Sequence, residues 1–315
     1  MLTLLLTTLL TVMPADTTDA LLPHYPTPVD TVTVDGRPIV YHDSGPATAS
    51  EAPPILFVHG LGSNMALWRD ALNTFGADHR VLALDLPGFG LSGKEDVPGT
   101  MPFFAETIAG FLDALGIDRV QYVGVSMGGQ IGMTLALERS ARIDRLALIS
   151  PAGIEQFTAQ EAAAIKQMTT PQSIQQADSN AVKQSIAVNF GTWASRFQWL
   201  LEQRLQLAQR SDFGQYAEAN ARSVVGMLDG PVIDRIDALP MPVLVLFGAE
   251  DKLIPNRYLH PTLTTAAVAD SARAALPEEA DVRLIDDAGH LLMLEQPAAF
   301  ERALRGFLNG SGSRE

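Results

Sequence analysis

The 315-residue sequence contains no cysteine. This absence excludes disulfide bonds, zinc sites built on thiolates and a cysteine nucleophile. Lysine is also scarce, with four in the chain, and 36 acidic residues against 22 basic ones give a net charge of −14. Such a charge argues against nucleic acid as a partner, because polyanions bind to fields of positive sign. Apolar residues, in contrast, make up 47% of the chain, enough to bury a sizeable core.

No Lys or Arg precedes Arg37, and the first residues are rich in leucine and threonine. Leucines recur with helical spacing over residues 2–13, a pattern that ends before Pro14 and is too short to span a bilayer, which takes about 20 apolar residues. A cleaved secretory signal would export the protein, but the basic start and the Ala-x-Ala cleavage site are missing. We therefore favour a retained helix and a cytoplasmic or membrane-associated protein. The helix would contact the protein body, a second copy in a homodimer or a membrane surface. An irregular lead-in follows it in the sequence, up to residue 27.

The chain from residue 28 alternates strand and helix signals. Residues 29–34 and 39–42 flank the turn Asp35-Gly36 and predict a hairpin. Uninterrupted apolar runs, which suit strands buried on both faces of a parallel sheet, then recur. They are Ile55–Val58, Val81–Leu84, Val120–Val125, Leu146–Ile149, Val243–Phe247 and Val282–Ile285. Helical stretches such as 65–75, 103–115 and 130–139 separate them, so we predict an α/β fold.

The alternation stops between about Gly153 and Arg235. This stretch holds 12 of the 15 glutamines and two of the three tryptophans, with helical spacing and little strand signal. We interpret residues 153–235 as a helical insertion that covers the sheet. The α/β core then consists of residues 28–152 and 236–309, and a Gly-Ser tail occupies 310–315.

The motif Gly124-Val125-Ser126-Met127-Gly128-Gly129 lies between a buried strand and a helix. A nucleophile on such a sharp turn needs flanking glycines, and the helix N-terminus would face a developing oxyanion. The alternative is a glycine-rich turn that only packs the helix on the sheet. The position between strand and helix favours Ser126 as a nucleophile.

A serine nucleophile needs a histidine base, which a carboxylate orients. His290 follows the last predicted strand, at the sheet edge where open α/β sheets place their sites. Asp251 and its neighbour Glu250 follow the preceding strand, and Glu155 follows the one before that. All three carboxylates are candidates for the third member.

The motif His59-Gly60-Leu61-Gly62 follows the strand at residues 55–58. Acyl transfer builds negative charge on the carbonyl oxygen, which two fixed donors must stabilise. The backbone amides of Leu61 and Met127 are the predicted donors of this oxyanion hole. We interpret His59 itself as a structural histidine that binds loop backbone.

Taken together, these motifs make the chain resemble the α/β-hydrolase family of esterases, lipases and carbon–carbon hydrolases. They are His59-Gly60, Asp85–Ser92, Gly124–Gly129, Gly248–Asp251 and Gly289-His290, in family order. The resemblance implies an eight-stranded, mostly parallel sheet with helices on both faces, a helical cap between strands six and seven, and no cofactor or metal. It also implies a catalytic triad of Ser126, Asp251 and His290, since the family spacing favours Asp251 over Glu250 and Glu155. In the family, Asp85–Ser92 is a structural turn.

The expected activity is hydrolysis of a small-molecule carboxylic ester through an acyl-enzyme, as in a serine carboxylesterase or lipase. Aromatic side chains of the insertion would line the acyl pocket or pack the core of the cap. They are Phe157, Trp193, Phe197 and Trp199.

Two alternatives remain open. The same triad could hydrolyse a diketone carbon–carbon bond or an amide, with Arg196, Arg204 or Arg222 contacting an acidic substrate. Carbon–carbon hydrolases of the family often have Trp after the histidine, where this chain has Leu291. The chain could also be a non-catalytic ligand-binding member.

Overall fold

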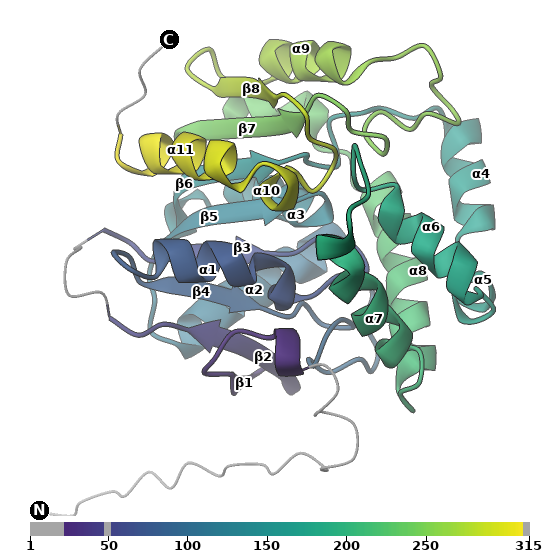
Figure 1. The fold of residues 1–315 in the computed structure, drawn as a ribbon. Helices are drawn as coiled ribbons and strands as arrows, with labels where there is room; N and C mark the ends of the chain where they lie inside the picture. Colours follow the sequence, from purple (N-terminus) through teal and green to yellow (C-terminus); the bar gives the residue numbers. More distant parts are fainter. Residues whose placement is uncertain (1–21, 47–51, 311–315) are drawn as a thin grey trace, which may run out of the picture.

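The computed structural model describes residues 22–46 and 52–310 (Figure 1). The predicted helix over residues 2–13 therefore lies outside the described residues, as does most of the predicted tail. Within the described ranges, no helix is both long and apolar enough to cross a membrane.

Eight strands form a single sheet in the order β1-β2-β4-β3-β5-β6-β7-β8. Their bounds are β1 Asp30–Val34, β2 Arg37–Asp43, β3 Ile55–Val58, β4 Val81–Leu84, β5 Val120–Val125, β6 Ile143–Ile149, β7 Val243–Gly248 and β8 Asp281–Ile285. The β1–β2 and β2–β4 pairs are antiparallel, and the remaining pairs are parallel. The fold is thus an α/β fold with an eight-stranded, mostly parallel sheet, as predicted.

Helices cover both faces of this sheet (Figure 1). One face carries α1 (Arg69–Phe75), α10 (Leu292–Glu295) and α11 (Pro297–Leu308), and the other carries α2 (Met101–Ala114), α3 (Met127–Glu138) and α9 (Thr265–Ala275). Short 3₁₀ helices are η1 Leu22–His24, η2 Met65–Trp68, η3 Ser140–Arg142 and η5 Ile233–Ala238.

The strands separate two hydrophobic clusters, one under each layer of helices. In β3, Ile55 and Phe57 belong to the cluster of α1 and α11, whereas Leu56 and Val58 belong to the cluster of α2 and α3. All four side chains are fully buried. Because successive strand residues point to opposite faces, burial on both faces requires the unbroken apolar runs seen in the sequence.

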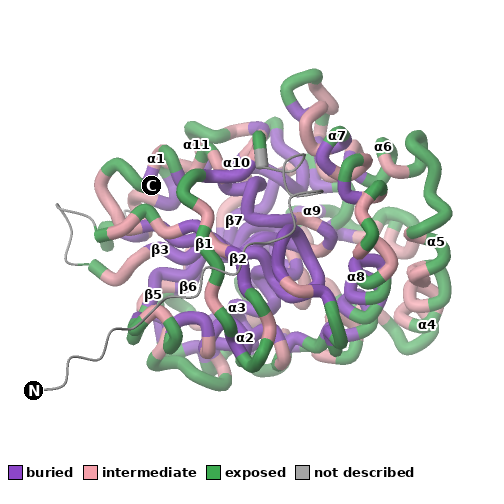
Figure 2. Tube along the Cα trace, turned by 90° about the horizontal axis from the view of Figure 1, so that it is seen from below, coloured by how far each residue is buried: buried purple, intermediate pink, exposed green. Residues whose placement is uncertain are grey.

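Between β6 and β7 the chain forms helices only. They are α4 Ala159–Met168, α5 Pro171–Gln175, α6 Ser179–Ala187, η4 Ser195–Phe197, α7 Gln198–Leu207, α8 Phe213–Asp229 and η5. Figure 1 shows α4–α8 gathered at one end of the strands, on the right of the view. Neither α4 nor α5 contains a buried residue, and Figure 2 shows them at the outer edge of the molecule.

The predicted strands 55–58, 81–84 and 120–125 coincide with β3, β4 and β5. The structure extends β6 back to Ile143, whereas the sequence predicted a start at Leu146. Asp144 and Arg145 interrupt the apolar run and are only partly buried, which hid this part of the strand. The predicted turn at Asp35-Gly36 is present, with φ values of 47° and 78°.

Candidate active site

Ser126 lies on the sharp turn between β5 and α3, with φ 55° and ψ −120°. This left-handed backbone is strained for a residue other than glycine. The turn brings α3 so close to β3 that a Cβ on Gly128 would lie 2.6 Å from the carbonyl oxygens of Val58 and His59. Glycine at position 128 is therefore a packing requirement, and the backbone around it presents Ser126 at the end of the sheet.

Asp251 follows β7 and His290 follows β8, and their side chains are hydrogen bonded. His290 Nδ1 lies 2.8 Å from Asp251 Oδ2, and the side chains are 3% and 0% exposed. Since an ionised carboxylate only accepts hydrogen bonds, the imidazole proton on this side belongs on Nδ1. Nε2 of His290 is then the nitrogen left to accept a proton from another group.

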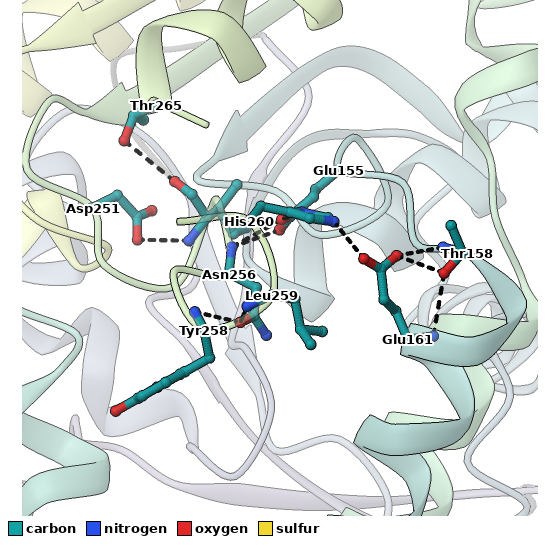
Figure 3. A network of polar contacts seen from close by, with 10 residues as sticks. Glu155, Thr158, Glu161, Asp251, Asn256, Tyr258, Leu259, His260 and Thr265 are labelled. Atoms are coloured by element: carbon teal, nitrogen blue, oxygen red, sulfur yellow. Dashed lines mark hydrogen bonds and ion pairs between the residues drawn. The ribbon is translucent and has the colours of Figure 1, made fainter. Parts of the chain in front are cut away.

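The two rival carboxylates have other surroundings. Glu250 is exposed, and its carboxylate lies against Gly191. Glu155 is 2.5 Å from Nδ1 of His260 and accepts two bonds from the amide of Asn256. Figure 3 shows this network, with His260 between Glu155 and Glu161 and with Asp251 on the adjoining part of the chain. Of the three candidates, Asp251 is the one bonded to His290.

The loop after β3 lies directly against the nucleophile, since a Cβ on Gly60 would be 3.1 Å from Cβ of Ser126. His59 is fully buried; its Nδ1 donates to the Gly60 carbonyl at 2.8 Å, and its Nε2 accepts from the Leu86 amide at 3.0 Å. Burial lowers the pKa of His59 to about 4, so its ring is neutral at physiological pH. In this tautomer the ring can make both bonds at once.

These contacts set the direction of the Leu61 amide. The Gly60 carbonyl and the Leu61 N–H belong to one trans peptide and point in opposite directions. His59 and the Ser63 amide (3.3 Å) both donate to the Gly60 oxygen. The Leu61 N–H therefore points away from these two donors. Met127, the second predicted donor, is the first residue of α3, where N–H groups have no acceptor within the helix.

A cavity of about 1310 Å³ opens over these residues, and Ser126, His290 and Leu61 all line it. Its walls come from the strand ends and from α4–α8, and most of them are apolar. Examples are Ala162, Ile165, Ile174, Val182, Leu205 and Val224. The helices between β6 and β7 therefore form much of the space next to the candidate nucleophile.

Of the four aromatic pocket candidates, Phe157 lines this cavity. Trp193, Phe197 and Trp199 are not among its lining residues. Phe197 stacks on Phe190 with ring centroids 4.1 Å apart, and Trp193 packs edge-on against both rings. Trp199 packs against His24 and Arg69. Aromatic area is thus used to pack the helical segment onto the core.

The three arginines considered as contacts for an acidic substrate also have different surroundings. Arg204 lines the cavity, whereas Arg196 donates to the carbonyl of Glu295 and Arg222 to that of Val97. Sequence reasoning missed Gln203, a cavity residue that is 5% exposed and whose Nε2 is buried without a partner. Its only sequence signal was the glutamine-rich composition of the segment.

The turn Asp85–Ser92 packs beside the site. The Asp85 carboxylate accepts from the Tyr25 hydroxyl and from the amides of Met65 and Leu91. Burial raises its pKa to about 6. These bonds join three separate parts of the chain, as expected of a structural turn. Among residues 22–46 and 52–310, no group of three or more His, Asp or Glu side chains is arranged to hold a metal ion.

Residues 53–297 match a family model described as alpha/beta hydrolase fold. A 2-hydroxymuconate semialdehyde hydrolase of a Pseudomonas species is 29% identical, over 85% of this chain and 89% of its own length. A probable hydrolytic enzyme from Pseudomonas aeruginosa superposes with a TM-score of 0.78 at 23% identity, covering 90% of this chain and 94% of that one.

A third relative is longer than this chain. It is the dihydrolipoyllysine-residue acetyltransferase component of the acetoin cleaving system of Pseudomonas putida, 29% identical over 81% of this chain. The chain spans 63% of the length of that relative. The similarity therefore concerns part of that protein.

Proposed function

This chain belongs to the alpha/beta hydrolase fold family, and we propose that it is a serine hydrolase that cleaves carboxylic esters. Ser126 is the proposed nucleophile, His290 the general base and Asp251 the residue that orients it. The proposed oxyanion donors are the amides of Leu61 and Met127.

The observation that best supports this proposal is the pairing of His290 with a fully buried carboxylate at the wall of a cavity that Ser126 also lines. The bond to Asp251 occupies Nδ1 of His290 and leaves Nε2 as the basic nitrogen. A serine hydroxyl is a weak nucleophile that requires such a base. The strained backbone at Ser126 and the adjacent helix N-terminus add to this support, because both are features of nucleophile turns.

In the first half of the proposed reaction, Ser126 Oγ attacks the ester carbonyl carbon while His290 accepts the hydroxyl proton. The carbonyl oxygen becomes an oxyanion, which the Leu61 and Met127 amides stabilise. Asp251 stabilises the imidazolium that forms. When the tetrahedral intermediate collapses, His290 returns the proton to the leaving alcohol, and the acyl group stays on Ser126.

In the second half, water attacks the acyl-enzyme. His290 accepts a proton from the water as the new carbon–oxygen bond forms, and the same two amides stabilise the second oxyanion. Collapse breaks the bond to Ser126 Oγ, which regains its proton from His290. The carboxylic acid leaves and the free enzyme is restored.

The cavity supports a substrate with a large apolar group. Ligand pockets commonly measure about 300–1,000 Å³, and this cavity of about 1310 Å³ is larger. Its α4, α5 and α6 walls contribute Ile165, Ile174 and Val182, whose side chains offer no hydrogen bonds to a polar group. We therefore propose that medium or long acyl esters are better substrates than acetates.

A fluorophosphonate probe followed by a p-nitrophenyl ester series tests this proposal. Wild type should be labelled at Ser126, and Ser126→Ala should lose both labelling and several orders of magnitude of turnover. Ser271→Ala, on the outer helix α9, is the matched control and should behave as wild type. Labelling at another serine would refute the assignment of Ser126, and a folded wild type without labelling would favour a non-catalytic ligand-binding member.

Hydrolysis of a carbon–carbon bond is the second candidate. It is favoured by the similarity to the 2-hydroxymuconate semialdehyde hydrolase and by the polar side chains of Gln203 and Arg204 in the cavity wall. Leu291, where carbon–carbon hydrolases often have Trp, argues against it. Comparing kcat/KM for p-nitrophenyl esters and for ring-fission diketones on the same preparation separates the two activities.

A further inference from the structure

Three polar side chains from α7 and α8 converge on Gly62, in the loop after β3. Gly62 has φ +66°, and a Cβ there would lie 2.9 Å from Asn220 Nδ2, 3.0 Å from Arg204 Nη2 and 3.1 Å from Tyr216 Oη. These helices are separated from the loop by more than a hundred residues of sequence. A glycine in this left-handed conformation leaves room for all three groups.

Two of these side chains donate to the Gly62 carbonyl oxygen. Arg204 Nη2 makes one bond, and Tyr216 Oη makes the other at 3.2 Å. Tyr216 Oη also accepts from Asn220 Nδ2 at 3.3 Å. Burial raises the pKa of Tyr216, so the hydroxyl keeps the proton that it donates.

The rings around Tyr216 hold its hydroxyl in this position. Tyr216 is fully buried, and it packs edge-on against Phe89 and stacks on Phe213. The guanidinium of Arg204 lies 5.3 Å from the centre of the Tyr216 ring. The two donors therefore support each other as well as the Gly62 carbonyl.

The Leu61 residue lies between two anchored carbonyls. On one side the Gly60 oxygen accepts from His59, a residue of the α/β core, and on the other the Gly62 oxygen accepts from α7 and α8. Asn64 adds a further tie, since its Nδ2 donates to Gln203 Oε1 at 2.9 Å. The Gly60 carbonyl shares a peptide with the Leu61 N–H, and the Gly62 carbonyl shares the next peptide but one with the Ser63 N–H, which donates to the Gly60 oxygen at 3.3 Å. The donors on the Gly62 oxygen therefore help to hold the Gly60–Ser63 turn closed around Leu61.

We propose that Arg204 and Tyr216 are positioning residues that hold the Gly60–Ser63 loop in its oxyanion-binding shape. This inference rests on the proposed function, because it concerns the Leu61 amide in the same reaction. It gives α7 and α8 a second role besides forming the cavity wall. The oxyanion hole is complete when α7 and α8 contact this loop. The helices that line the substrate cavity therefore also hold the backbone that binds the oxyanion.

Tyr216→Phe is the least disruptive test, because it removes one oxygen atom and keeps the packed ring. An aryl trifluoromethyl ketone, to which a serine adds to form an oxyanion, reports on the oxyanion hole. We expect kcat to fall on the order of 10-fold, less than the 10²–10³ lost when an oxyanion donor itself is removed. The ketone should bind more weakly by a similar factor, while KM for a p-nitrophenyl ester changes by less than about twofold.

Arg204→Ala should have the same signature, with partial recovery in Arg204→Lys, whose ammonium can still donate to the carbonyl. Arg222→Ala, an arginine of α8 that contacts Val97 and Glu218 instead, is the matched control and should match wild type. Unchanged kcat and unchanged ketone affinity in folded Tyr216→Phe and Arg204→Ala would overturn the proposal, as would a raised KM at constant kcat. If Tyr216→Phe fails to fold, kcat and ketone affinity of Arg204→Ala and Arg204→Lys test the proposal instead.

The wild-type protein separates this test from the test of function. If the ketone and the fluorophosphonate leave wild type unaffected, the proposed function fails and the positioning role fails with it. If both reagents inhibit wild type and the Arg204 and Tyr216 variants behave as wild type, the positioning role alone fails.

Discussion

The two carboxylate oxygens of Asp251 have different partners. Oδ1 accepts the amides of Leu253 and Ile254 at 2.8 and 3.0 Å, and Oδ2 is bonded to Nδ1 of His290. The first two bonds fix the plane of the carboxylate, and the third fixes the ring of His290. The orientation of the proposed base is therefore set by backbone amides that lie two and three residues beyond the aspartate.

Asp251→Asn should lower kcat by about 10⁴-fold, because an amide nitrogen facing Nδ1 favours the wrong imidazole tautomer. Glu250→Gln makes the same chemical change one residue earlier, on an exposed side chain. It should leave kcat within about twofold of wild type. Steady-state ester hydrolysis by both variants, with circular dichroism to check folding, makes the comparison. If Glu250→Gln is the more damaging change, our assignment of the carboxylate is wrong.

His59 links stability to pH. Burial lowers its pKa from 6.5 to about 4, so the unfolded chain takes up a proton at a higher pH than the folded protein does. Stability is therefore lost as pH falls from about 6.5 to about 4, by ~3 kcal/mol in total. Asp85 acts in the opposite direction, since its raised pKa of about 6 means that the folded state gains a proton first.

The variant His59→Asn isolates this effect, because it retains Asp85 and removes the titrating ring. Between pH 7 and pH 4, wild type should lose ~3 kcal/mol more unfolding free energy than the variant does. Urea unfolding at several pH values measures the difference. Parallel stability curves for the two proteins would mean that His59 titrates normally in the folded state.

The outer helices α4 and α5 contribute residues to the cavity wall but contain no buried residue. Ala162 of α4 lines the cavity, and its neighbour Ala163 is exposed and lies outside it. Ala162→Trp should fill part of the space, lowering kcat/KM for decanoate esters at least about 10-fold while acetate turnover is kept. Ala163→Trp adds the same bulk on the outside and should leave the chain-length profile unchanged. Equal profiles for the two variants would show that the acyl group does not occupy this part of the cavity.

Phe197 has the opposite role in the same segment. It is 3% exposed and stacked on Phe190, so Phe197→Ala should lower the unfolding free energy by about 3 kcal/mol. The acyl-length preference should stay that of wild type, because the ring does not line the cavity. Urea unfolding and the ester series measure the two effects. A changed preference with unchanged stability would show instead that Phe197 lines the acyl pocket, the other role considered for it.

The accuracy of sequence-based prediction differs between these elements for a physical reason. The buried strands, such as β3 and β5, follow from runs of apolar residues that need no knowledge of neighbours. The glycine turn around Ser126 is equally local. The contacts of Trp193 and Phe197 depend on how the segment before α7 packs on the core, and composition does not encode that packing.

The sequence also left Asp251 and Glu250 unresolved until the family spacing was considered, because adjacent residues follow the same strand. Their side chains leave the backbone in different directions, and only the folded chain shows that His290 is bonded to Asp251. The bonds from Arg204 and Tyr216 to Gly62 cross from the helical segment to the core. No local sequence pattern predicts a contact between groups so far apart in sequence.

At the scale of the whole molecule, the fold brings together groups that lie on separate strands. Ser126, Asp251 and His290 follow β5, β7 and β8, and the loop with Leu61 follows β3. Parallel strands end at the same edge of the sheet, so four distant parts of the chain meet there. The helices between β6 and β7 lie at this end of the strands and line much of the cavity.

The sheet, both hydrophobic clusters and the cavity are formed by residues after position 21. The proposed catalytic residues all come after the leucine pattern over residues 2–13, which lies outside the described residues. An isolated helix of that length is marginal in water and persists when its apolar stripe is buried. We expect this stripe to be buried against protein rather than in lipid, because no Lys or Arg before Arg37 would attract an anionic membrane.

Deleting residues 2–13 should therefore leave ester turnover by the soluble protein near the wild-type value. The melting temperature should fall if the stripe packs on the protein body, and the mass in solution should fall from dimer to monomer if it packs on a second copy. Light scattering and thermal unfolding measure these outcomes, and sedimentation with phosphatidylglycerol vesicles measures the alternative. Vesicle binding by the full chain that disappears on deletion, with mass and melting temperature unchanged, would refute protein packing. A mature terminus beyond Pro14, found by N-terminal sequencing, would show instead that the segment is a cleaved signal.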